Sequence, residues 1–344
     1  MKVKHEIDLE KYDIRTDLAI ESLENHKEET TEKRILEKDD VRVTDVYIDE
    51  ENSQKIGKRV GNYTTIEFAD ITDFQNKEKV KKIFSKKLKE LLKKLKIKQD
   101  ASALVIGLGN RKSTPDALGP LTIDSILVTR HLFAVEEVGE GFRNVCAISP
   151  GVMGTTGIET SDMTRSIIET VQPDFVIAID ALASQSVTRV NQTIQMTDTG
   201  IHPGSGIGNS RKEISEAVFG IPVIAIGVPT VVDAVTIVSD TIHYMYEHYA
   251  YMKQNMGNPM LKLATSPINY LKKNVQIEET DKQALFGMLG TLTESETKSL
   301  IFEVLSPIGY NLMVTPKEVD FVMEKLADIL GNGINEALHK KVER

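Results

Sequence analysis

The sequence predicts an α/β protein with a mixed, mostly parallel sheet, helices on both faces of the sheet and further helices at the C-terminus. Short apolar runs recur along the middle of the chain, each typical of a buried strand. A segment with helical periodicity follows most of these runs, and such alternation favours parallel or mixed sheets. Beyond residue 280, helix-start signals replace the strand pattern, with Thr293 and Glu296 spaced as a capping box and Pro316 at a first-turn position.

The N-terminal part of the chain shows two different patterns. Residues 1 to about 40 are charged and poorly periodic, so we expect an extension with short helical pieces. Val41–Ile48 alternates between apolar and polar residues, and Lys58–Phe68 is rich in Val, Tyr, Thr and Ile. These two segments predict a pair of strands, arranged as a hairpin.

A strongly basic segment follows. Residues 77–98 contain eleven lysines and two glutamates, a local charge of +9 in a chain whose net charge is −9. Val80, Phe84, Leu88 and Leu91 recur at helical spacing, which predicts an amphipathic helix. A nucleic-acid or membrane surface is one interpretation. Packing on a sheet with a solvated lysine face is the favoured one, because no arginine or aromatic residue is interleaved with the lysines.

The strand and helix pattern then continues to the C-terminus. We expect strands at 103–108, 144–149, 174–179, 190–197 and 222–227, and helices at about 115–133, 160–172, 230–252, 281–290, 294–304 and 316–338. No internal repeat or low-complexity linker interrupts the pattern. One α/β domain with an appended C-terminal helical region is the simplest account.

Composition excludes several classes of protein. The chain of 344 residues has no apolar run near the roughly 20 residues of a membrane helix. It begins without the apolar core of a signal peptide, so we expect a cytoplasmic protein. Its single cysteine, Cys146, cannot form an intramolecular disulfide, which agrees with a reducing compartment.

Two aspartates lie where an open parallel sheet places reacting groups. Asp180 ends the apolar run that begins at Phe175, and Asp116 lies just past the strand and glycine turn at 103–110. Ligands of such sheets bind beyond the carboxyl ends of the strands. Two carboxylates within about 8 Å can share a proton, one as acid and one as base. Burial raises the pKa of Asp180, and a helix N-terminus lowers the pKa of Asp116.

Other residues around this edge leave alternatives open. The segment 200–209 has four glycines, and His202, Gly204 and Gly206 are candidates for substrate contact or an auxiliary role. With Asp116 and Asp180, His202 would also make an oxygen and nitrogen ligand set for a metal-assisted reaction. Gly107–Asn110 lacks the third glycine of a dinucleotide fingerprint, because Lys112 stands there. We therefore expect no cofactor.

The chain resembles the germination protease family of spore-forming Firmicutes. The motifs that carry this resemblance span nearly the whole chain: Gly107–Asn110, Thr114–Pro120, Ser149–Gly154, Phe175–Leu182, Gly200–Gly206 and Val228–Ala234. The resemblance implies a fold similar to that of hydrogenase maturation endopeptidases. It also implies an endopeptidase that initiates degradation of small acid-soluble spore proteins during germination, with Asp116 and Asp180 as catalytic residues and no known metal.

The resemblance further implies a self-processing zymogen that forms a homotetramer in the spore core. Family targets are cut after glutamate and before an apolar residue followed by alanine, and Asp17, Leu18 and Ala19 resemble that pattern. We expect self-cleavage between Asp17 and Leu18, so that residues 1–17 are a propeptide and 18–344 the peptidase domain. Glu67–Asp70 has a similar pattern inside an expected strand and should resist cleavage. We expect no membrane partner and no direct nucleic-acid binding.

Overall fold

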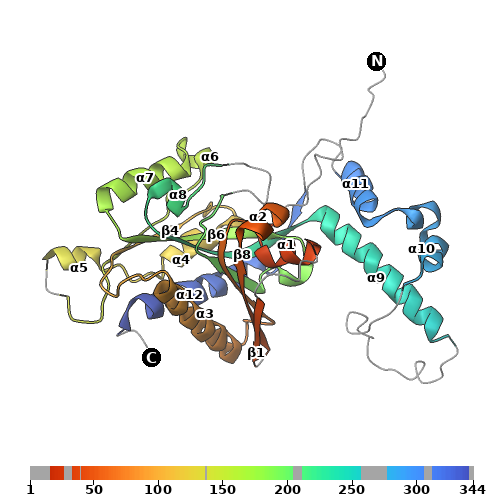
Figure 1. The fold of residues 1–344 in the computed structure, drawn as a ribbon, viewed down its shortest axis with the longest axis horizontal. Helices are drawn as coiled ribbons and strands as arrows, with labels where there is room; N and C mark the ends of the chain where they lie inside the picture. Colours follow the sequence, from red (N-terminus) through yellow and green to blue (C-terminus); the bar gives the residue numbers. More distant parts are fainter. Residues whose placement is uncertain are drawn as a thin grey trace, which may run out of the picture. The chain divides into compact units, whose positions relative to one another are not determined.

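A mixed sheet forms the framework of the larger of two units (Figure 1). The computed structural model describes residues 16–26, 33–38, 40–135, 138–203, 211–256, 277–305 and 312–340. The chain divides into a larger unit, made of Arg15–Val232 and Thr315–Arg344, and a smaller unit that contains Asp233–Val314.

The larger unit carries almost all of the strands. Its elements are α1 (Ala19–His26), β1 (Lys33–Lys38), β2 (Val41–Ile48), α2 (Glu50–Ile56), β3 (Gly61–Phe68), α3 (Phe74–Lys94), β4 (Ala103–Gly107), the 3-10 turn η2 (Thr114–Asp116), α4 (Leu118–Ile123), α5 (Arg130–Val135), β5 (Val145–Ile148), α6 (Met153–Thr156), α7 (Thr160–Val171), β6 (Phe175–Ser184), η3 (Val187–Arg189), β7 (Thr193–Thr197), α8 (Glu216–Phe219), β8 (Val223–Asp233) and α12 (Val319–Leu338).

The sheet has a parallel half and an antiparallel half. Its strand order is β1-β2-β3-β7-β8-β6-β4-β5. Strands β5, β4, β6 and β8 run parallel, whereas β7, β3, β2 and β1 pair antiparallel. The mixed α/β sheet, the β2–β3 hairpin pairing and the C-terminal helices agree with the sequence-based expectation. The parallel strands are buried on both faces, which explains their continuous apolar runs.

Helices cover both faces of the parallel half (Figure 1). On one face, α3 and α12 pack with strand residues such as Ile177 and Ile226 into the main core. On the other face, Val176 and Ala178 belong to a second cluster, against which Ile167 of α7 and Phe219 of α8 pack. The carboxyl end of β6 therefore emerges from an apolar layer that is closed above and below.

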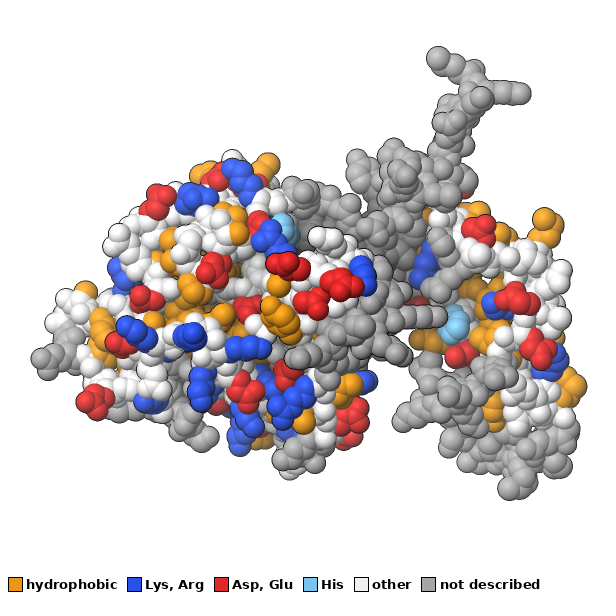
Figure 2. All heavy atoms as spheres, viewed as in Figure 1, with side chains coloured by type: hydrophobic (Ala, Val, Ile, Leu, Met, Phe, Trp, Pro, Cys, Tyr) orange, Lys and Arg blue, Asp and Glu red, His pale blue; other side chains and the backbone are white. Residues whose placement is uncertain are grey.

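The basic helix α3 packs against the core, as the periodicity predicts. Val80, Phe84 and Leu88 are fully buried. Figure 2 shows Lys and Arg side chains gathered over α3, with Asp and Glu among them. Lys87 Nζ lies 2.6 Å from Asp45 Oδ2, and Lys81 Nζ lies 3.3 Å from Glu336 Oε1. These lysines are therefore paired within the protein, which agrees with the favoured packing interpretation.

Two expectations about local structure are wrong in part. The short helix α1 agrees with the helical pieces expected before residue 40, but Leu18, Ala19 and Ile20 are buried and β1 adds a strand that was not expected. The single helix expected at 115–133 is interrupted between α4 and α5. There the Leu127 N–H donates to Asn335 Oδ1 of α12 at 2.8 Å, a tertiary contact that replaces a helical hydrogen bond.

The smaller unit is mostly helical. It contains α9 (Ala234–Gln254), α10 (Glu279–Phe286), the 3-10 segment η7 (Gly287–Thr291), α11 (Glu294–Leu305) and the short strand β9 (Met313–Val314). The rings of Tyr246 and Phe286 meet edge-on, with centroids 5.4 Å apart, where α9 meets α10. Among the described residues, no helix has the length and apolarity needed to span a membrane.

We predict that Phe84→Ala lowers the free energy of unfolding by about 3–5 kcal/mol, because it leaves a cavity between α3 and α12. A Cβ at Gly333 of α12 would lie 2.4 Å from Phe84 Cδ1, so the two helices are in tight contact at this point. Phe74→Ala on the same helix is the control, because Phe74 is 71% exposed. It should change stability by no more than about 0.5 kcal/mol. Urea unfolding measures both variants, and an equal loss of unfolding free energy in Phe84→Ala and Phe74→Ala would contradict this account.

Candidate active site

Asp180 lies at the centre of the candidate site. It follows five apolar residues of β6 and is 5% exposed. Its Oδ1 accepts a hydrogen bond from the Ala181 N–H at 2.9 Å. Burial raises the pKa of Asp180 well above its ordinary value, and the charges of Asp116 and Asp17 raise it further. Burial therefore disfavours the ionised form of the Asp180 carboxyl group.

Asp116 lies in the turn that follows β4. The Asn110 N–H donates to Asp116 Oδ2 at 2.8 Å and also to the Asp116 carbonyl oxygen at 3.0 Å. Gly109 permits this close approach. Its φ is +105°, and a Cβ there would lie 2.1 Å from the Asp116 carbonyl oxygen. The glycine turn after β4 thus fixes the position of Asp116.

The environment of Asp116 differs from the expected helix start. Asp116 ends the 3-10 turn η2, which is preceded by Ser113 and has no side-chain cap. The predicted lowering of its pKa by a helix dipole is wrong. Burial raises the pKa of Asp116, although the Asn110 hydrogen bond and the charge of Arg211 oppose the rise. The three-residue turn offers little dipole, so desolvation has the larger effect.

The two carboxyl groups are electrostatically coupled but unequal. The charge of Asp116 is the second cause of the raised pKa of Asp180, after burial. Asp180 is the more deeply buried of the two and shows the larger rise in pKa. The more deeply buried Asp180 is therefore the group in which the charged form is more strongly disfavoured. Their separation of about 8 Å stays a prediction.

Only the first part of the glycine-rich loop, up to Pro203, belongs to the described residues. His202 Nε2 lies 3.8 Å from Glu213 Oε2, and Glu213 also pairs with Arg59. Gly204 and Gly206 lie outside the described residues. Within the described part of the chain, no three His, Cys, Asp or Glu side chains are grouped to hold a metal ion. His202 therefore does not complete a ligand set with Asp116 and Asp180.

The predicted cleavage site lies along the end of β6. The Asp17 N–H donates to the Ala183 carbonyl oxygen at 3.2 Å, and the Ala183 N–H donates to Asp17 Oδ2 at 2.8 Å. Leu18 is fully buried and packs with Leu182 and Ile20. Strand β4, the neighbour of β6, ends at Gly107, which pairs with Ile179. The edge of β6 beyond Ile179 is therefore open to residues 16–18. Residues 16–18 are thus docked close enough to Asp180 for Asp17 to affect its pKa.

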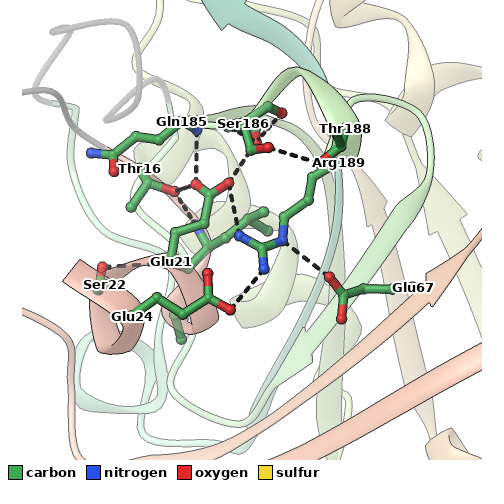
Figure 3. A network of polar contacts seen from close by, with 12 residues as sticks. Thr16, Glu21, Ser22, Glu24, Glu67, Gln185, Ser186, Thr188 and Arg189 are labelled. Atoms are coloured by element: carbon green, nitrogen blue, oxygen red, sulfur yellow. Dashed lines mark hydrogen bonds and ion pairs between the residues drawn. The ribbon is translucent and has the colours of Figure 1, made fainter. Parts of the chain in front are cut away.

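A polar network anchors the segment that follows the predicted cleavage site (Figure 3). Glu21 of α1 is buried and accepts hydrogen bonds from Ser184 Oγ at 2.7 Å and from the Gln185 N–H at 2.8 Å. Arg189 bridges Glu21, Glu24 and Glu67, with N–O distances of 3.4, 2.9 and 3.1 Å. The network ties α1 to the end of β6 and to β3.

Two charged residues near the aspartates, Lys58 and Arg211, were missed by sequence reasoning. Lys58 Nζ donates to the Thr16 carbonyl oxygen at 2.6 Å. Burial lowers the pKa of Lys58, and the charges of Asp17 and Glu21 oppose that change. Arg211 opposes the raised pKa values of both Asp116 and Asp180. No local pattern marks these residues, since their roles depend on segments far apart in the sequence.

An open α/β sheet with a coupled acid and base beyond its strand ends is an arrangement suited to hydrolysis. Comparison with known proteins defines the class. A family model described as germination protease matches residues 9–344. The chain belongs to the germination protease family and is therefore an endopeptidase of spore germination.

The relatives match over nearly their full length. The germination protease of Geobacillus sp. (strain WCH70) is 49% identical over 360 residues, covering 98% of this chain and 97% of that protein. The germination protease of Priestia megaterium is 48% identical, covering 99% and 98%. A NiFe hydrogenase maturation protease from Thermococcus kodakarensis KOD1 aligns at a TM-score of 0.24 and 15% identity, over 38% of this chain and 74% of that one.

We predict that the raised pKa of Asp180 makes the native chain less stable as pH rises. The folded state binds this proton more tightly than the unfolded state, whose aspartate has a pKa of about 3.9. The stabilisation of the fold by Asp180 is thus complete below about pH 3.9 and is lost as pH rises through the raised pKa of the folded state. Asp180→Asn cannot ionise, so its stability relative to the native chain should increase with pH across that interval. Urea unfolding at a series of pH values measures the difference.

Asp174→Asn is the matched control for this pH dependence. Its carboxylate accepts hydrogen bonds from the Ser102 N–H at 2.6 Å and Ser102 Oγ at 2.8 Å, which lower the pKa of Asp174. Asp174 therefore stabilises the fold at pH values above its pKa in the unfolded chain, and this stabilisation is lost as pH falls through its pKa in the folded chain. The free energy of unfolding of Asp174→Asn, relative to that of the native chain, should therefore decrease as pH rises. A pH-independent difference for Asp180→Asn would contradict the raised pKa.

Proposed function

We propose that this protein initiates degradation of small acid-soluble spore proteins by an aspartate-dependent cleavage of the peptide bond. The observation that carries the proposal is the buried Asp180, whose pKa is raised by burial and by the charge of Asp116. The two positions supply an acid and a base at one sheet edge, as peptide hydrolysis needs. The family to which the chain belongs supports the same reaction. The proposal uses no cofactor.

The proposed reaction needs a single water molecule. Asp116 accepts a proton from the water while its oxygen attacks the carbonyl carbon, and Asp180 donates its proton to the carbonyl oxygen. The tetrahedral intermediate collapses when Asp116 passes its proton to the amide nitrogen; the C–N bond breaks, one hydroxyl group returns its proton to Asp180, and a carboxylic acid and an amine leave. Because the two aspartates are coupled, their proton belongs to the pair.

We further propose that the chain is a zymogen that cuts itself between Asp17 and Leu18. The docking of residues 16–18 on β6 supports this, because an extended segment that adds to a strand edge is a common mode of peptide binding. Until it is cut, the segment occupies the edge that an outside substrate needs. Acidification is the proposed trigger, since the pair works only when it holds one proton.

Assembly and location follow from the same resemblance. We propose a homotetramer in the cytoplasm of the spore core. Exposed apolar side chains of α9 support self-association, among them Tyr244, Met245 and Met252. No membrane partner and no direct nucleic-acid binding belong to the proposal.

We predict that Asp116→Asn and Asp180→Asn each lower kcat on a small acid-soluble spore protein by about 10²-fold or more, because either change removes one half of the acid–base pair. Asp124→Asn is the control, because Asp124 is half-exposed and pairs with Arg111 outside the site. Its kcat should equal that of the unchanged chain. Near-normal turnover by either active-site variant, with folding verified by thermal unfolding, would refute the dyad. Activity that a chelator abolishes would favour the metal-assisted alternative.

We also predict that self-cleavage is first-order, with a rate independent of protein concentration, because the segment is docked on its own β6. Mass spectrometry after incubation at mildly acidic pH should give a product that begins at Leu18, and the Asp180→Asn variant should give none. Glu67 and Phe68 lie in β3, paired on both sides, so no product should begin at Phe68. A rate that rises in proportion to concentration would contradict cleavage within one chain.

A further inference from the structure

We propose that Gln195 is a further catalytic residue, whose side-chain amide stabilises the negative charge that develops on the carbonyl oxygen of the cleaved bond. This inference rests on the proposed function, because it takes Asp17–Leu18 as the bond to be cut. Gln195 lies on β7 and is 6% exposed.

The amide of Gln195 contacts the docked segment on both sides of that bond. Its Nε2 donates to the Asp17 carbonyl oxygen at 3.1 Å, and its Oε1 accepts from the Ala19 N–H at 2.7 Å. The two hydrogen bonds fix the orientation of the amide. A reversed amide would place donor against donor and acceptor against acceptor. The N–H group therefore faces the oxygen of the Asp17–Leu18 peptide bond.

The sheet places Gln195 in one row with Asp180. Gly227 of β8 pairs with Asp180 of β6 on one side and with Gln195 of β7 on the other. Residues paired in register point to the same face of a sheet, and neighbouring strands lie about 4.8 Å apart. The side chains of Asp180 and Gln195 therefore rise on the same face, roughly 10 Å apart at their Cα atoms.

The Leu182 side chain covers the position between these two side chains. A Cβ on Gly227 would lie 2.5 Å from the Leu182 side chain. Leu182 in turn packs against Leu18. The Asp17–Leu18 bond is thus held on this face of the sheet, with its carbonyl oxygen bonded to Gln195 and the Asp17 carboxyl group close enough to Asp180 to affect its pKa.

This placement suits a group that acts when charge develops. When water attacks the Asp17 carbonyl carbon, the electron pair of the C=O bond moves to the oxygen. The Gln195 N–H is already directed at that oxygen, so the hydrogen bond strengthens in the transition state without reorganisation. Gln195 transfers no proton, because Asp180 supplies it. In buried surroundings such a donor has a larger effect than in water.

The test is the rate of self-cleavage in the full-length Gln195→Met chain. Methionine has a similar length and stays neutral, but it has no N–H donor. We expect the product beginning at Leu18 to form about 10²–10³-fold more slowly, the loss typical of one oxyanion donor. Gln99→Met is the control, because Gln99 is exposed on the turn after α3. Thermal unfolding verifies that both variants are folded.

A second measurement separates catalysis from binding. After processing has gone to completion, kcat and KM are measured on a synthetic peptide with the sequence of residues 11–24. A fall in kcat at nearly constant KM supports the inference. A change confined to KM, or self-cleavage within about twofold of the unchanged chain, overturns it. If Asp116→Asn and Asp180→Asn keep their activity, the proposed function fails instead, whatever Gln195→Met does.

Discussion

The burial of the Asp180 carboxyl group is the constraint on which the rest of the structure depends. An ionised carboxylate at the end of an apolar strand, closed off by helices on both faces, is strongly disfavoured. Burial and the charge of the acidic neighbour Asp116 raise the pKa of Asp180, whereas the hydrogen bond from the Ala181 N–H opposes the rise. The parallel half of the sheet, α3, α12 and α7 together create the apolar layer that buries this carboxyl group. The same packing that stabilises the fold therefore also raises the pKa of Asp180.

The N-terminal segment belongs to this arrangement and is not an appendage. Residues 16–18 pair with the end of β6, and α1 is fixed by Glu21 and Arg189 (Figure 3). Arg189 meets three carboxylates, which raise its pKa despite its burial. The network of Arg189 and three glutamates beyond Leu18 holds α1 in place, whereas Asp17 lies close enough to Asp180 to raise its pKa.

Local patterns in the sequence were sufficient for much of the fold. The apolar run of β6 and the helical spacing of Val80, Phe84 and Leu88 depend on neighbouring residues, so they could be read directly. The position of Asp116 and Asp180 beyond parallel strands followed from the same reasoning. The anchoring of α1, the break between α4 and α5, and the contacts of Gln195 could not be read in this way. Each depends on a hydrogen bond between residues far apart in the chain, such as Leu127 with Asn335.

The free edge of β6 beyond Ile179 has a consequence for selectivity. Residues 181–184 continue past the end of β4 and meet the docked segment through backbone N–H and carbonyl groups as well as side chains. Under the proposed function, a substrate that binds as the docked segment does would offer an unpaired backbone N–H group to this edge. Natively folded proteins have almost all such groups already engaged in helices and sheets. Binding of this kind would spare folded neighbours and admit chains that lack stable structure, before any side chain is recognised.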